Sequence, residues 1–414
     1  MNTDLLVIGG GIAGITAAVE AAETGREVVL VEKQHQLGGR VLQMHKYFPK
    51  LCPPVCGLEI NFRRIRQNPK IKVLTGAKPT SIEGVPGDLT AIIHVEPSYV
   101  KADFTSGNGV ENDCPVEIAD RFNFGMNRTK AFRLPHELAY PYRYVIDEES
   151  AHDPAMKQFI ESSGIEGVDL DMQPEDVEVK AKAVIWATGW EPYDANKLDH
   201  LAYGRLPNVV TNMEMERIAA VNGPTKGKIL RPSDQQPITR AAFVQCAGSR
   251  DENHLPYCSA VCCMASLKQS RYIREQYPDA EIHIFFIDAR TPGRWEDFYQ
   301  EVQEDEKTVI HRGKVARIEE AGNGMVTLTA ENTLTGKLEQ VSVDMAILAT
   351  GMVPTVAVDA PPIKINVDEF GFIQNNGTSV VVGAGVATGP KDVASTNEEA
   401  TGAVVRALQM MTGK

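Results

Sequence analysis

The chain has 414 residues, of which 43% are hydrophobic and 34 are glycines, a composition typical of an α/β protein with two or three domains. A formal net charge of −13 argues against nucleic-acid binding and against docking on an anionic membrane surface. No apolar run reaches the roughly 18 to 20 residues that span a bilayer, and a folded pattern begins at about residue 4, which leaves no room for a cleavable signal. We therefore expect a cytoplasmic protein whose seven cysteines are not structural disulfides.

The first predicted element is a short apolar strand over residues 4–8. It runs directly into the sequence Gly-Gly-Gly-Ile-Ala-Gly at 9–14, and a helical pattern follows over 15–23. A strand, the pattern G-x-G-x-x-G and a helix in this order predict a dinucleotide site, because the helix N-terminus offers free N–H groups to a diphosphate.

Each glycine of this motif has an expected task. Gly9 allows the tight turn, Gly11 lets the backbone approach a pyrophosphate, and Gly14 lets the helix pack close to the strand. A second strand over 27–31 ends in Glu32, where an acid is expected to hold a ribose hydroxyl. Because a carboxylate there would repel a 2′-phosphate, the ligand is predicted to be FAD or NAD rather than NADP.

A second glycine pair, Gly38-Gly39, follows Glu32 and is itself followed by Arg40. This segment resembles the FAD-binding motif of two-dinucleotide-fold flavoproteins, the relatives of thioredoxin reductase and glutathione reductase. The resemblance favours FAD and implies that all three residues contact it.

Two apolar strands that each end in Ala-Thr-Gly support this interpretation. They lie at 183–189 and 345–351, and in that superfamily such strands close the excursions between the dinucleotide folds. The resemblance places Thr188 and Gly189 at the FAD. We therefore predict an α/β fold with two Rossmann-like dinucleotide-binding domains.

The predicted domain organisation is discontinuous. The FAD domain is expected to open over 1–96 and to be interrupted by an insertion with weak strand patterning over 97–175. It is expected to resume over 176–205, to give way to a second Rossmann-like domain over 206–339, and to finish over 340–414 with a helix at 398–411.

The second domain departs from a nicotinamide-binding pattern. Its first strand ends in Val-Gln-Cys-Ala-Gly-Ser-Arg at 244–250, and no glycine triplet follows. Instead there are four cysteines with the spacing C-x11-C-x3-C-C, namely Cys246, Cys258, Cys262 and Cys263. Four thiolates complete a [4Fe–4S] cluster. The spacing alone also fits buried apolar thiols, a structural zinc site or a redox dithiol at 262–263.

Three segments of the chain resemble the A subunit of heterodisulfide reductase. They are the cysteine segment 245–264, the segment 47–52 and the segment 382–392, and the similarity extends over nearly the whole chain. In that family the cysteine quartet binds a [4Fe–4S] cluster beside an FAD. The resemblance implies both cofactors for this chain.

The insertion departs from the family. Its A subunits carry ferredoxin-type cysteine runs in the middle of the chain, whereas here Cys114 stands alone before a proline. One cysteine cannot hold a cluster, so we expect a degenerate ferredoxin-like region. Together with the shorter length, this makes the chain most similar to the A subunit of the quinone-interacting membrane-bound oxidoreductase of sulfate reducers.

That resemblance implies a function within a complex. The chain would pass electrons between the quinone pool and adenylylsulfate reductase, and would be active only with partner subunits. The expected partners are a second subunit that carries flavin or iron–sulfur centres, together with a membrane subunit that reacts with quinone. They would hold the chain at the cytoplasmic side of the inner membrane.

Two cysteines lie close to the second glycine pair. Cys52 and Cys56 form a C-x3-C pair separated by two prolines and a valine. One interpretation is a redox pair near the flavin, and the other is two buried thiols in a proline-stiffened loop; the spacing, which is not C-x2-C or C-x4-C, slightly favours the second.

Near the C-terminus, Val386 stands where the superfamily usually has an aspartate after the glycine. We expect Gly385 and the start of the last helix to bind FAD through backbone N–H groups. Lys391 either stabilises negative charge on reduced flavin or is an ordinary surface lysine.

The sequence thus predicts an electron-transfer flavoprotein in which a cluster replaces the nicotinamide nucleotide of the second domain. An alternative is a free-standing NADH-dependent disulfide or quinone reductase that uses Cys52 and Cys56. A third is a structural subunit with a vestigial FAD site.

Overall fold

The computed structural model describes residues 1–104, 109–376 and 380–412, and these divide into two compact units. Unit 1 comprises Met1–Leu42, Val55–Trp190 and Pro354–Lys414, and unit 2 comprises Gln43–Pro54 and Glu191–Val353. Strands β10 (Trp190–Pro192) and β19 (Met352–Pro354), which each contain a boundary, pair with one another.

Unit 1 is built around a parallel sheet with the strand order β20-β9-β1-β2-β3. Its helices and strands are β1 (Leu5–Ile8), α1 (Ile12–Glu23), β2 (Val28–Glu32), α2 (Gly39–Leu42), α3 (Val55–Gln67), β3 (Ile71–Thr75), β4 (Ala77–Val85), β5 (Asp88–Val95), β6 (Glu117–Ala119), β7 (Arg128–Lys130), α4 (Glu148–Ala151), α5 (Pro154–Ser163), β8 (Glu175–Ala181), β9 (Ala183–Trp186), α9 (Thr355–Val358), β20 (Val381–Gly383) and α10 (Val393–Thr412). The predicted strands at 4–8, 27–31 and 183–186 are confirmed, and the last helix begins earlier than expected.

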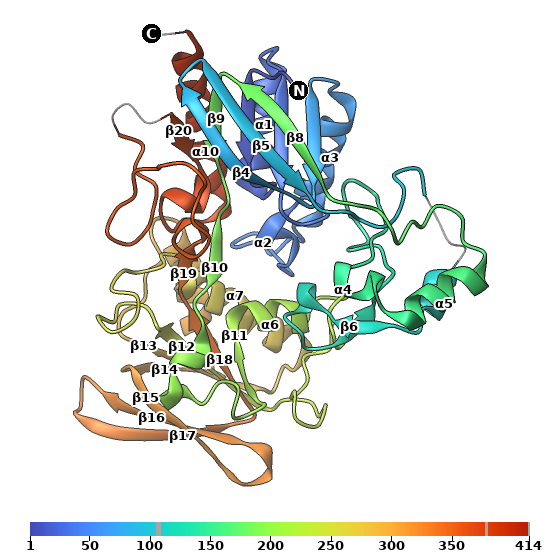
Figure 1. Ribbon diagram of the computed structural model, residues 1–414. Coiled ribbons are helices and arrows are strands. Elements are labelled where there is room, and N and C mark those ends of the chain that lie inside the picture. The colour runs from blue at the N-terminus through green and yellow to red at the C-terminus, as the bar shows by residue number, and fades with distance from the viewer. Residues whose placement is uncertain (105–108, 377–379, 413–414) are drawn as a thin grey trace. The chain divides into compact units, whose positions relative to one another are not determined.

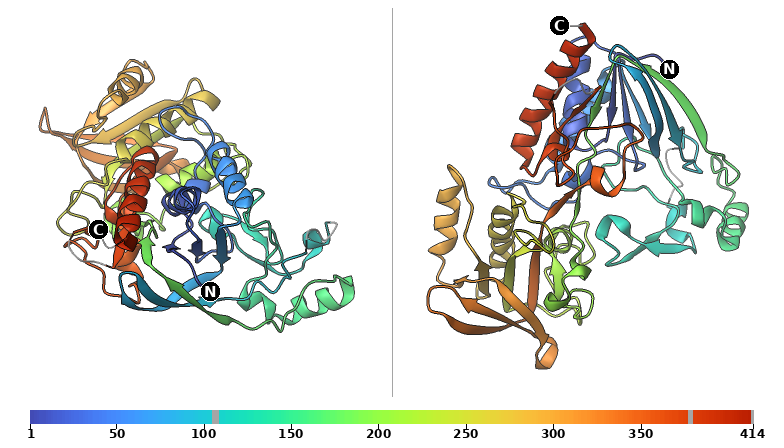
Figure 2. Two further views of the ribbon diagram at one scale, coloured as in Figure 1. Left: turned by 90° about the horizontal axis from the view of Figure 1, so that it is seen from above. Right: turned by 60° about the vertical axis from the view of Figure 1, so that its left-hand side comes forward.

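Both faces of this sheet are covered, which explains why its central strands are continuously apolar. The antiparallel sheet β4–β5–β8 packs on one face, where Leu6, Val29 and Val184 share a core with Leu89 and Ile93. Helices α1 and α10 lie side by side on the other face (Figures 1 and 2).

The segment expected to be an insertion leaves the sheet between β5 and β8. It has a small core of its own, in which Tyr99, Phe132, Tyr144 and Met156 pack together with the thiol of Cys114. Its secondary structure is sparse, with the two-stranded sheet β6–β7 and the short helices α4 and α5. The ferredoxin-like origin of this segment stays a prediction.

Unit 2 contains a second parallel sheet, with the strand order β11-β18-β12-β13-β14. Its helices and strands are β11 (Val209–Thr211), α6 (Asn212–Ala219), β12 (Arg240–Ala247), α7 (Cys262–Gln276), β13 (Glu281–Phe286), α8 (Trp295–Gln303), β14 (Thr308–Arg312), β15 (Val315–Glu320), β16 (Val326–Asn332), β17 (Lys337–Val343) and β18 (Met345–Thr350). The antiparallel meander β15–β16–β17 packs on one face of this sheet, and α6 and α7 lie against the other (Figure 1).

The expectation that the chain returns to the first domain at Met345 is wrong. Strand β18 pairs in parallel with both β11 and β12 and therefore lies inside the sheet of unit 2. An apolar strand ending in Ala-Thr-Gly looks the same in sequence in either sheet, because a parallel strand covered on both faces is apolar throughout.

Residues 191–205 also belong to unit 2, because Tyr193, Leu198 and Leu201 pack in its core. The predicted limits of 206–339 for the second domain and 340–414 for the end of the first therefore differ from the observed units by about fifteen residues at each side.

A twelve-residue strap, Gln43–Pro54, also belongs to unit 2. The carboxylate of Glu216 accepts a hydrogen bond from the backbone N–H of His45 (2.9 Å) and pairs with Lys268 (2.9 Å). Lys268 in turn donates to the backbone carbonyl of Lys46 (2.8 Å). Because these side chains are buried and mutually satisfied, they fix the strap on α6 and α7.

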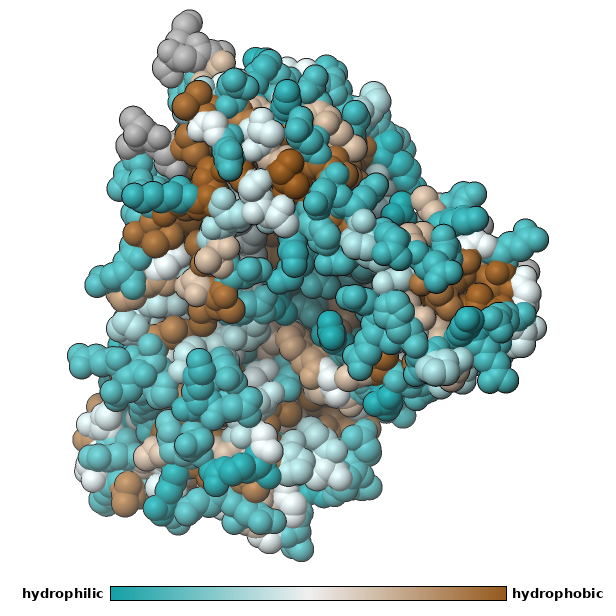
Figure 3. Space-filling view, viewed as in Figure 1, coloured by the Kyte–Doolittle hydropathy of each residue, from teal (hydrophilic) through white to brown (hydrophobic). Residues whose placement is uncertain are grey.

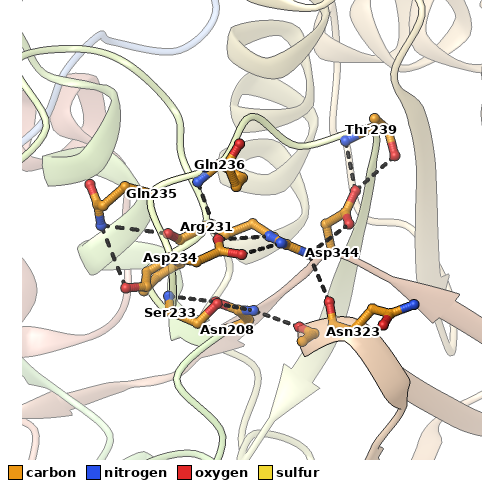
Figure 4. Close-up of polar contacts among 11 residues, drawn as sticks. Asn208, Arg231, Ser233, Asp234, Gln235, Gln236, Thr239, Asn323 and Asp344 are labelled. Carbon is orange, nitrogen blue, oxygen red and sulfur yellow. Dashed lines mark hydrogen bonds and ion pairs between the residues drawn. The ribbon is translucent and has the colours of Figure 1, made fainter.

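A polar cluster around Asp344 fixes the start of β18 (Figure 4). One carboxylate oxygen accepts hydrogen bonds from the backbone N–H and hydroxyl of Thr239 and from the backbone N–H of Arg240, at 2.7 to 2.9 Å. The other lies 3.5 Å from the guanidinium of Arg231, which also pairs with Asp234. The cluster joins the loop before β12 to the strand beside it.

Hydrophilic residues cover most of the face seen in Figure 3, and hydrophobic residues form small separate groups. Among the described residues, no helix is long and apolar enough to cross a membrane.

Candidate functional site

The glycine loop after β1 is held close to its surroundings in unit 1. Gly9 has a φ of +105°, and a Cβ there would lie 2.4 Å from the carbonyl oxygen of Ala187. A Cβ on Gly14 would lie 1.8 Å from the carbonyl oxygen of Gly9. Neither position can therefore accept a side chain. This agrees with the tight turn expected at Gly9 and the close helix packing expected at Gly14.

The glycine motif at 9–14 and the glycine pair at 38–39 are in direct contact. The backbone N–H of Gly38 donates to the carbonyl of Gly10 (2.8 Å), and a Cβ on Gly39 would lie 2.9 Å from the Cα of Gly11. Gly11 itself faces open space, since the nearest atom to a Cβ there is 4.0 Å away. It is also the N-cap of α1 and no side chain caps the helix, so the first-turn N–H groups are available to an anion.

Glu32 supports this loop from the end of β2. One carboxylate oxygen accepts a hydrogen bond from the N–H of Gly10 (2.6 Å) and the other from the N–H of Gln34 (2.8 Å). Burial raises the pKa of Glu32. Since each carboxylate oxygen can accept a second hydrogen bond, the expected contact to a ribose hydroxyl is compatible with these bonds and stays a prediction.

The carboxyl edge of the same sheet carries the other predicted FAD residues. Thr188 follows β9, and its hydroxyl is buried without a hydrogen-bond partner among the described residues. Gly385 has a φ of +67°, and a Cβ there would lie 2.6 Å from that of Ala13, so its turn packs directly against α1. Open α/β sheets bind ligands beyond this edge.

Lys391 and Arg40, which were predicted to contact FAD, both interact with other residues of the protein. The ammonium of Lys391 donates to the carbonyl of Gly385 (3.3 Å), to the hydroxyl of Thr388 (2.7 Å) and to the carboxylate of Glu399 (2.6 Å). Lys391 is therefore not a free surface lysine; it holds the Gly385 turn against α10. The guanidinium of Arg40 lies 6.0 Å from the ring centre of Trp190.

The cysteine segment of unit 2 follows a distorted strand. Strand β12 shifts register against β18 between Val244 and Ala247, and Cys246, within this shift, has a φ of 56°. Arg250 and Ala260 also have positive φ values, of 55° and 59°. Such conformations are costly for residues with a side chain and accumulate at functional sites.

All four predicted cluster cysteines line one pocket in unit 2, here called the cysteine pocket. Its lining consists of Cys246, Ser249, Arg250, Cys258, Ser259, Ala260, Cys262, Cys263, Asp288 and Arg290. Cys262 and Cys263 open α7, whose N-cap residue provides no side-chain cap. The thiols are not paired as disulfides, and burial raises the pKa of Cys246, Cys262 and Cys263.

The donor set of the cysteine pocket fits an iron–sulfur cluster. Among the described residues, no three His, Cys, Asp or Glu side chains are arranged to hold a metal ion. In a [4Fe–4S] cluster each thiolate binds a different iron, so the four sulfurs surround the cluster rather than meeting at one ion. Arg250 and Arg290 in the same lining oppose the negative charge that four thiolates would bring.

The second Ala-Thr-Gly segment braces the cysteine pocket. The hydroxyl of Ser259 accepts a hydrogen bond from the N–H of Met352 (2.9 Å), and the hydroxyl of Tyr257 donates to the carbonyl of Met352 (2.8 Å). A Cβ on Gly351 would lie 2.3 Å from the hydroxyl of Ser249. This glycine is therefore required where β18 meets the cysteine loop.

The remaining cysteines lie elsewhere. Cys114 is buried, and its thiol contacts the carbonyl of Val116 (3.6 Å), as expected of a small apolar core residue. Cys52 and Cys56 are exposed, so the expectation of two buried thiols is wrong. Cys56 is the second residue of α3, and its side chain faces solvent.

Sequence reasoning missed Asp288 as a pocket residue. It follows β13, and its carboxylate pairs with Arg250 and, at 3.7 Å, with Arg290. The available signal was its position just beyond the carboxyl end of a parallel strand, next to the strand that carries Cys246.

Comparisons with known proteins identify the relatives of this chain. The family model of FAD-dependent oxidoreductases matches residues 4–47, which contain both glycine pairs. The A subunit of the H2:CoB-CoM heterodisulfide,ferredoxin reductase of Methanothermobacter marburgensis is 34% identical over 99% of this chain. The chain is homologous to the A subunit of heterodisulfide reductase. It spans 64% of the length of that relative.

Further relatives extend the homology to heterodisulfide reductases of other genera. The A subunit of the ferredoxin/F420H2-dependent CoB-CoM heterodisulfide reductase of Methanosarcina acetivorans is also 34% identical over 99% of the chain, which covers 53% of that relative. The second iron–sulfur A subunit of the CoB–CoM heterodisulfide reductase of Methanopyrus kandleri is 35% identical over 97% of the chain and 63% of its own length.

Solved structures confirm the fold class. Thioredoxin reductase from T. acidophilum matches the whole chain with a TM-score of 0.54 at 14% identity, covering 98% of that structure. Thioredoxin reductase from Lactococcus lactis gives the same TM-score at 13% identity. The chain therefore has a fold of the thioredoxin reductase type, with two Rossmann-like units.

Proposed function

We propose that this chain is an FAD- and iron–sulfur-containing electron-transfer subunit of a heterodisulfide-reductase-like oxidoreductase complex. The observation that carries the proposal is the cysteine pocket, in which four thiols gather beyond the carboxyl end of β12 in the second parallel sheet. FAD, when bound, exchanges electron pairs, and a [4Fe–4S] cluster exchanges single electrons.

The residues of unit 1 would hold the FAD. The first turn of α1 and the open position at Gly11 would receive the pyrophosphate, and Glu32 would receive a ribose hydroxyl. The buried hydroxyl of Thr188 would hydrogen-bond the ligand at the carboxyl edge of the sheet. The Gly385 turn, held in place by Lys391, would close the site with backbone groups.

The residues of unit 2 would hold the cluster. Cys246, Cys258, Cys262 and Cys263 would each bind one iron, and the start of α7 would direct its N–H groups toward the sulfurs. The support is that the Methanopyrus relative, which is 35% identical to this chain, is an iron–sulfur subunit.

We further propose that the complex is of the quinone-interacting membrane-bound type. Its partners would be a second subunit with flavin or iron–sulfur centres, together with a membrane subunit that reacts with quinone, and electrons would pass between the quinone pool and adenylylsulfate reductase. The support is the resemblance of the cysteine segment together with an insertion whose one cysteine, Cys114, lies in an apolar core. The chain would sit at the inner membrane through these partners.

Anaerobic cofactor analysis tests the proposal. We expect about one FAD with about four irons and four sulfides per chain, and no bleaching of the flavin by NADH. A flavin that NADH bleaches, without iron, would instead support a free-standing disulfide or quinone reductase. A colourless protein would support a structural subunit.

A further inference from the structure

Arg250 belongs to the lining of the cysteine pocket. It lines this pocket together with Cys246, and its guanidinium forms an ion pair with the carboxylate of Asp288. Cys246 lies at the end of β12, and Asp288 follows the neighbouring strand β13. The guanidinium is therefore held at the carboxyl end of β13, in the same pocket as a predicted cluster ligand at the end of the adjacent strand.

The backbone holds Arg250 in this position. Its N–H donates to the carbonyl of Tyr257 (3.1 Å), and its φ of 55° is a left-handed conformation that residues with a side chain rarely adopt. Its side chain is 23% exposed, so most of it is shielded from water. Such a shielded charge acts more strongly on a neighbouring sulfur than an exposed one does.

We propose that Arg250 donates a hydrogen bond to the Cys246 thiolate of the loaded cluster and raises the reduction potential of that cluster, with Asp288 as the positioning residue that holds the guanidinium. This inference rests on the proposed function. Reduction adds one electron, supplied by reduced FAD, and makes the cluster more negative by one charge without taking up a proton. A fixed cation that donates to a ligand sulfur stabilises the reduced cluster more than the oxidised one.

The expected effect is measurable. Removing one charge-assisted hydrogen bond typically changes an equilibrium constant by about tenfold. For a one-electron couple a tenfold change corresponds to about 59 mV. Arg250→Gln is therefore expected to lower the midpoint potential of the cluster by about this amount.

The experiment is an anaerobic redox titration of the full chain, followed by EPR for the cluster and by absorption for the flavin. Arg290→Gln is the matched control, because it removes the same charge from the same pocket. The side chain of Arg290 is 47% exposed and lies 3.7 Å from Asp288, so water screens its charge more than that of Arg250. We expect a clearly smaller shift for Arg290→Gln and an unchanged flavin potential in both variants.

Two further variants separate the roles. Arg250→Lys keeps the charge but loses the planar fork with which the guanidinium would bind both Asp288 and the Cys246 thiolate, so an intermediate potential is expected. If Arg250→Gln fails to assemble a cluster, the potential of Arg250→Lys alone tests the effect of Arg250 on the cluster. Asp288→Asn removes a negative charge, which by itself would raise the potential; a lower potential is expected because Arg250 is released.

The outcomes are distinguishable. A cluster potential unchanged in Arg250→Gln, a shift no larger than that of Arg290→Gln, or a wild-type potential in Arg250→Lys would overturn the role of Arg250. A raised potential in Asp288→Asn would overturn the positioning role. Wild-type protein without iron and sulfide would refute the proposed function itself. If the wild type carries the cluster and Arg250→Gln has the same cluster potential, only this inference is refuted.

Discussion

The loops that follow β1 in unit 1 and β12 in unit 2 occupy corresponding places and differ in what they leave free. Each follows a buried strand of a parallel sheet and leads into a helix without a side-chain cap. In unit 1 the connection is residues 9–11, and its glycines bring the backbone to within van der Waals contact of its neighbours. In unit 2 the connection is residues 248–261. Cys258 lies in this loop and the other three cysteines lie beside it, and all four line one pocket.

The comparison teaches that the scaffold and the ligand chemistry are separable. The parallel sheet and the uncapped helix supply the same edge in both units, and the connecting loop decides what binds there. A short glycine loop suits an extended diphosphate that needs backbone N–H groups. A longer loop with strained residues can bring several side chains to one point.

The largest expected effect comes from removing a predicted cluster ligand. Cys262→Ser should abolish the [4Fe–4S] EPR signal and lower the iron content from about four per chain, because a hydroxyl is a poor replacement for a thiolate ligand. FAD should stay bound, since its predicted residues lie in the other unit. Cys56→Ser, at an exposed thiol on α3, is the control and should keep full iron. Full iron in Cys262→Ser would show that Cys262 is not a cluster ligand and would contradict the proposed difference between the two loops.

A methyl group at the open glycine should affect FAD and spare the fold. In Gly11→Ala the new Cβ meets no atom nearer than 4.0 Å, so the melting temperature of the apoprotein should stay unchanged. It would, however, stand where the pyrophosphate approaches, and FAD affinity should fall about tenfold or more. Fluorescence titration with FAD measures the affinity.

Two other glycines serve as controls for this variant. Gly402→Ala, on α10 with nothing within 4 Å of the new Cβ, should leave FAD affinity unchanged. Gly14→Ala should lose the folded unit altogether, because its Cβ would lie 1.8 Å from a carbonyl oxygen. Wild-type FAD affinity in Gly11→Ala would show that the nucleotide does not pass over this loop.

The sheet that carries the cysteine loop depends on Asp344. Asp344→Ala leaves two backbone N–H groups and Arg231 without their acceptor and should lower the free energy of unfolding by about 3 kcal/mol. Asp234→Ala removes the exposed partner of the same arginine and should lower the free energy of unfolding far less, because solvent screens an exposed ion pair. Urea denaturation compares them, and equal effects would contradict the ranking.

Unit 2 should also show a gradual dependence of stability on pH. Burial lowers the pKa of His283 to about 4, whereas an unfolded histidine titrates near 6.5. The unfolded chain therefore binds the extra proton first, so the stability contributed by neutral His283 is complete above pH 6.5 and is lost as the pH falls toward 4. The slope corresponds to about 1.4 kcal/mol per pH unit within this window.

His283→Gln should flatten that part of the stability curve, which thermal unfolding between pH 4 and 7 would show. The groups that face His283 are Glu281, His311 and Arg240, and His311 is itself held by Glu339 at 2.8 Å. An identical pH profile for the variant would assign the dependence to those neighbours instead.

Much of the fold was predictable from the sequence. The strand before Gly9, the helix after Gly14 and the strand ending in Glu32 appear as expected, because short apolar runs and glycine patterns are local signals. The fourfold cysteine grouping was also predictable, since its members lie close together in sequence, and the structure places all four in one pocket.

The rest depended on contacts that no local pattern reports. The sheet to which Met345 belongs was predicted wrongly, because a buried strand carries no mark of its neighbours. The strap at 43–54 joins unit 2 through buried groups on α6 and α7 that lie more than 170 residues away in sequence. Asp288 likewise reaches the cysteine pocket only through the pairing of β12 with β13.

The central claim is that iron and sulfide occupy the second unit in place of a nicotinamide nucleotide. The most direct test is a crystal structure of anaerobically purified protein with diffraction data recorded on both sides of the iron absorption edge. The account predicts an anomalous peak enclosed by Cys246, Cys258, Cys262 and Cys263. A map without iron between these four sulfurs, or with a nucleotide bound beside them, would contradict it.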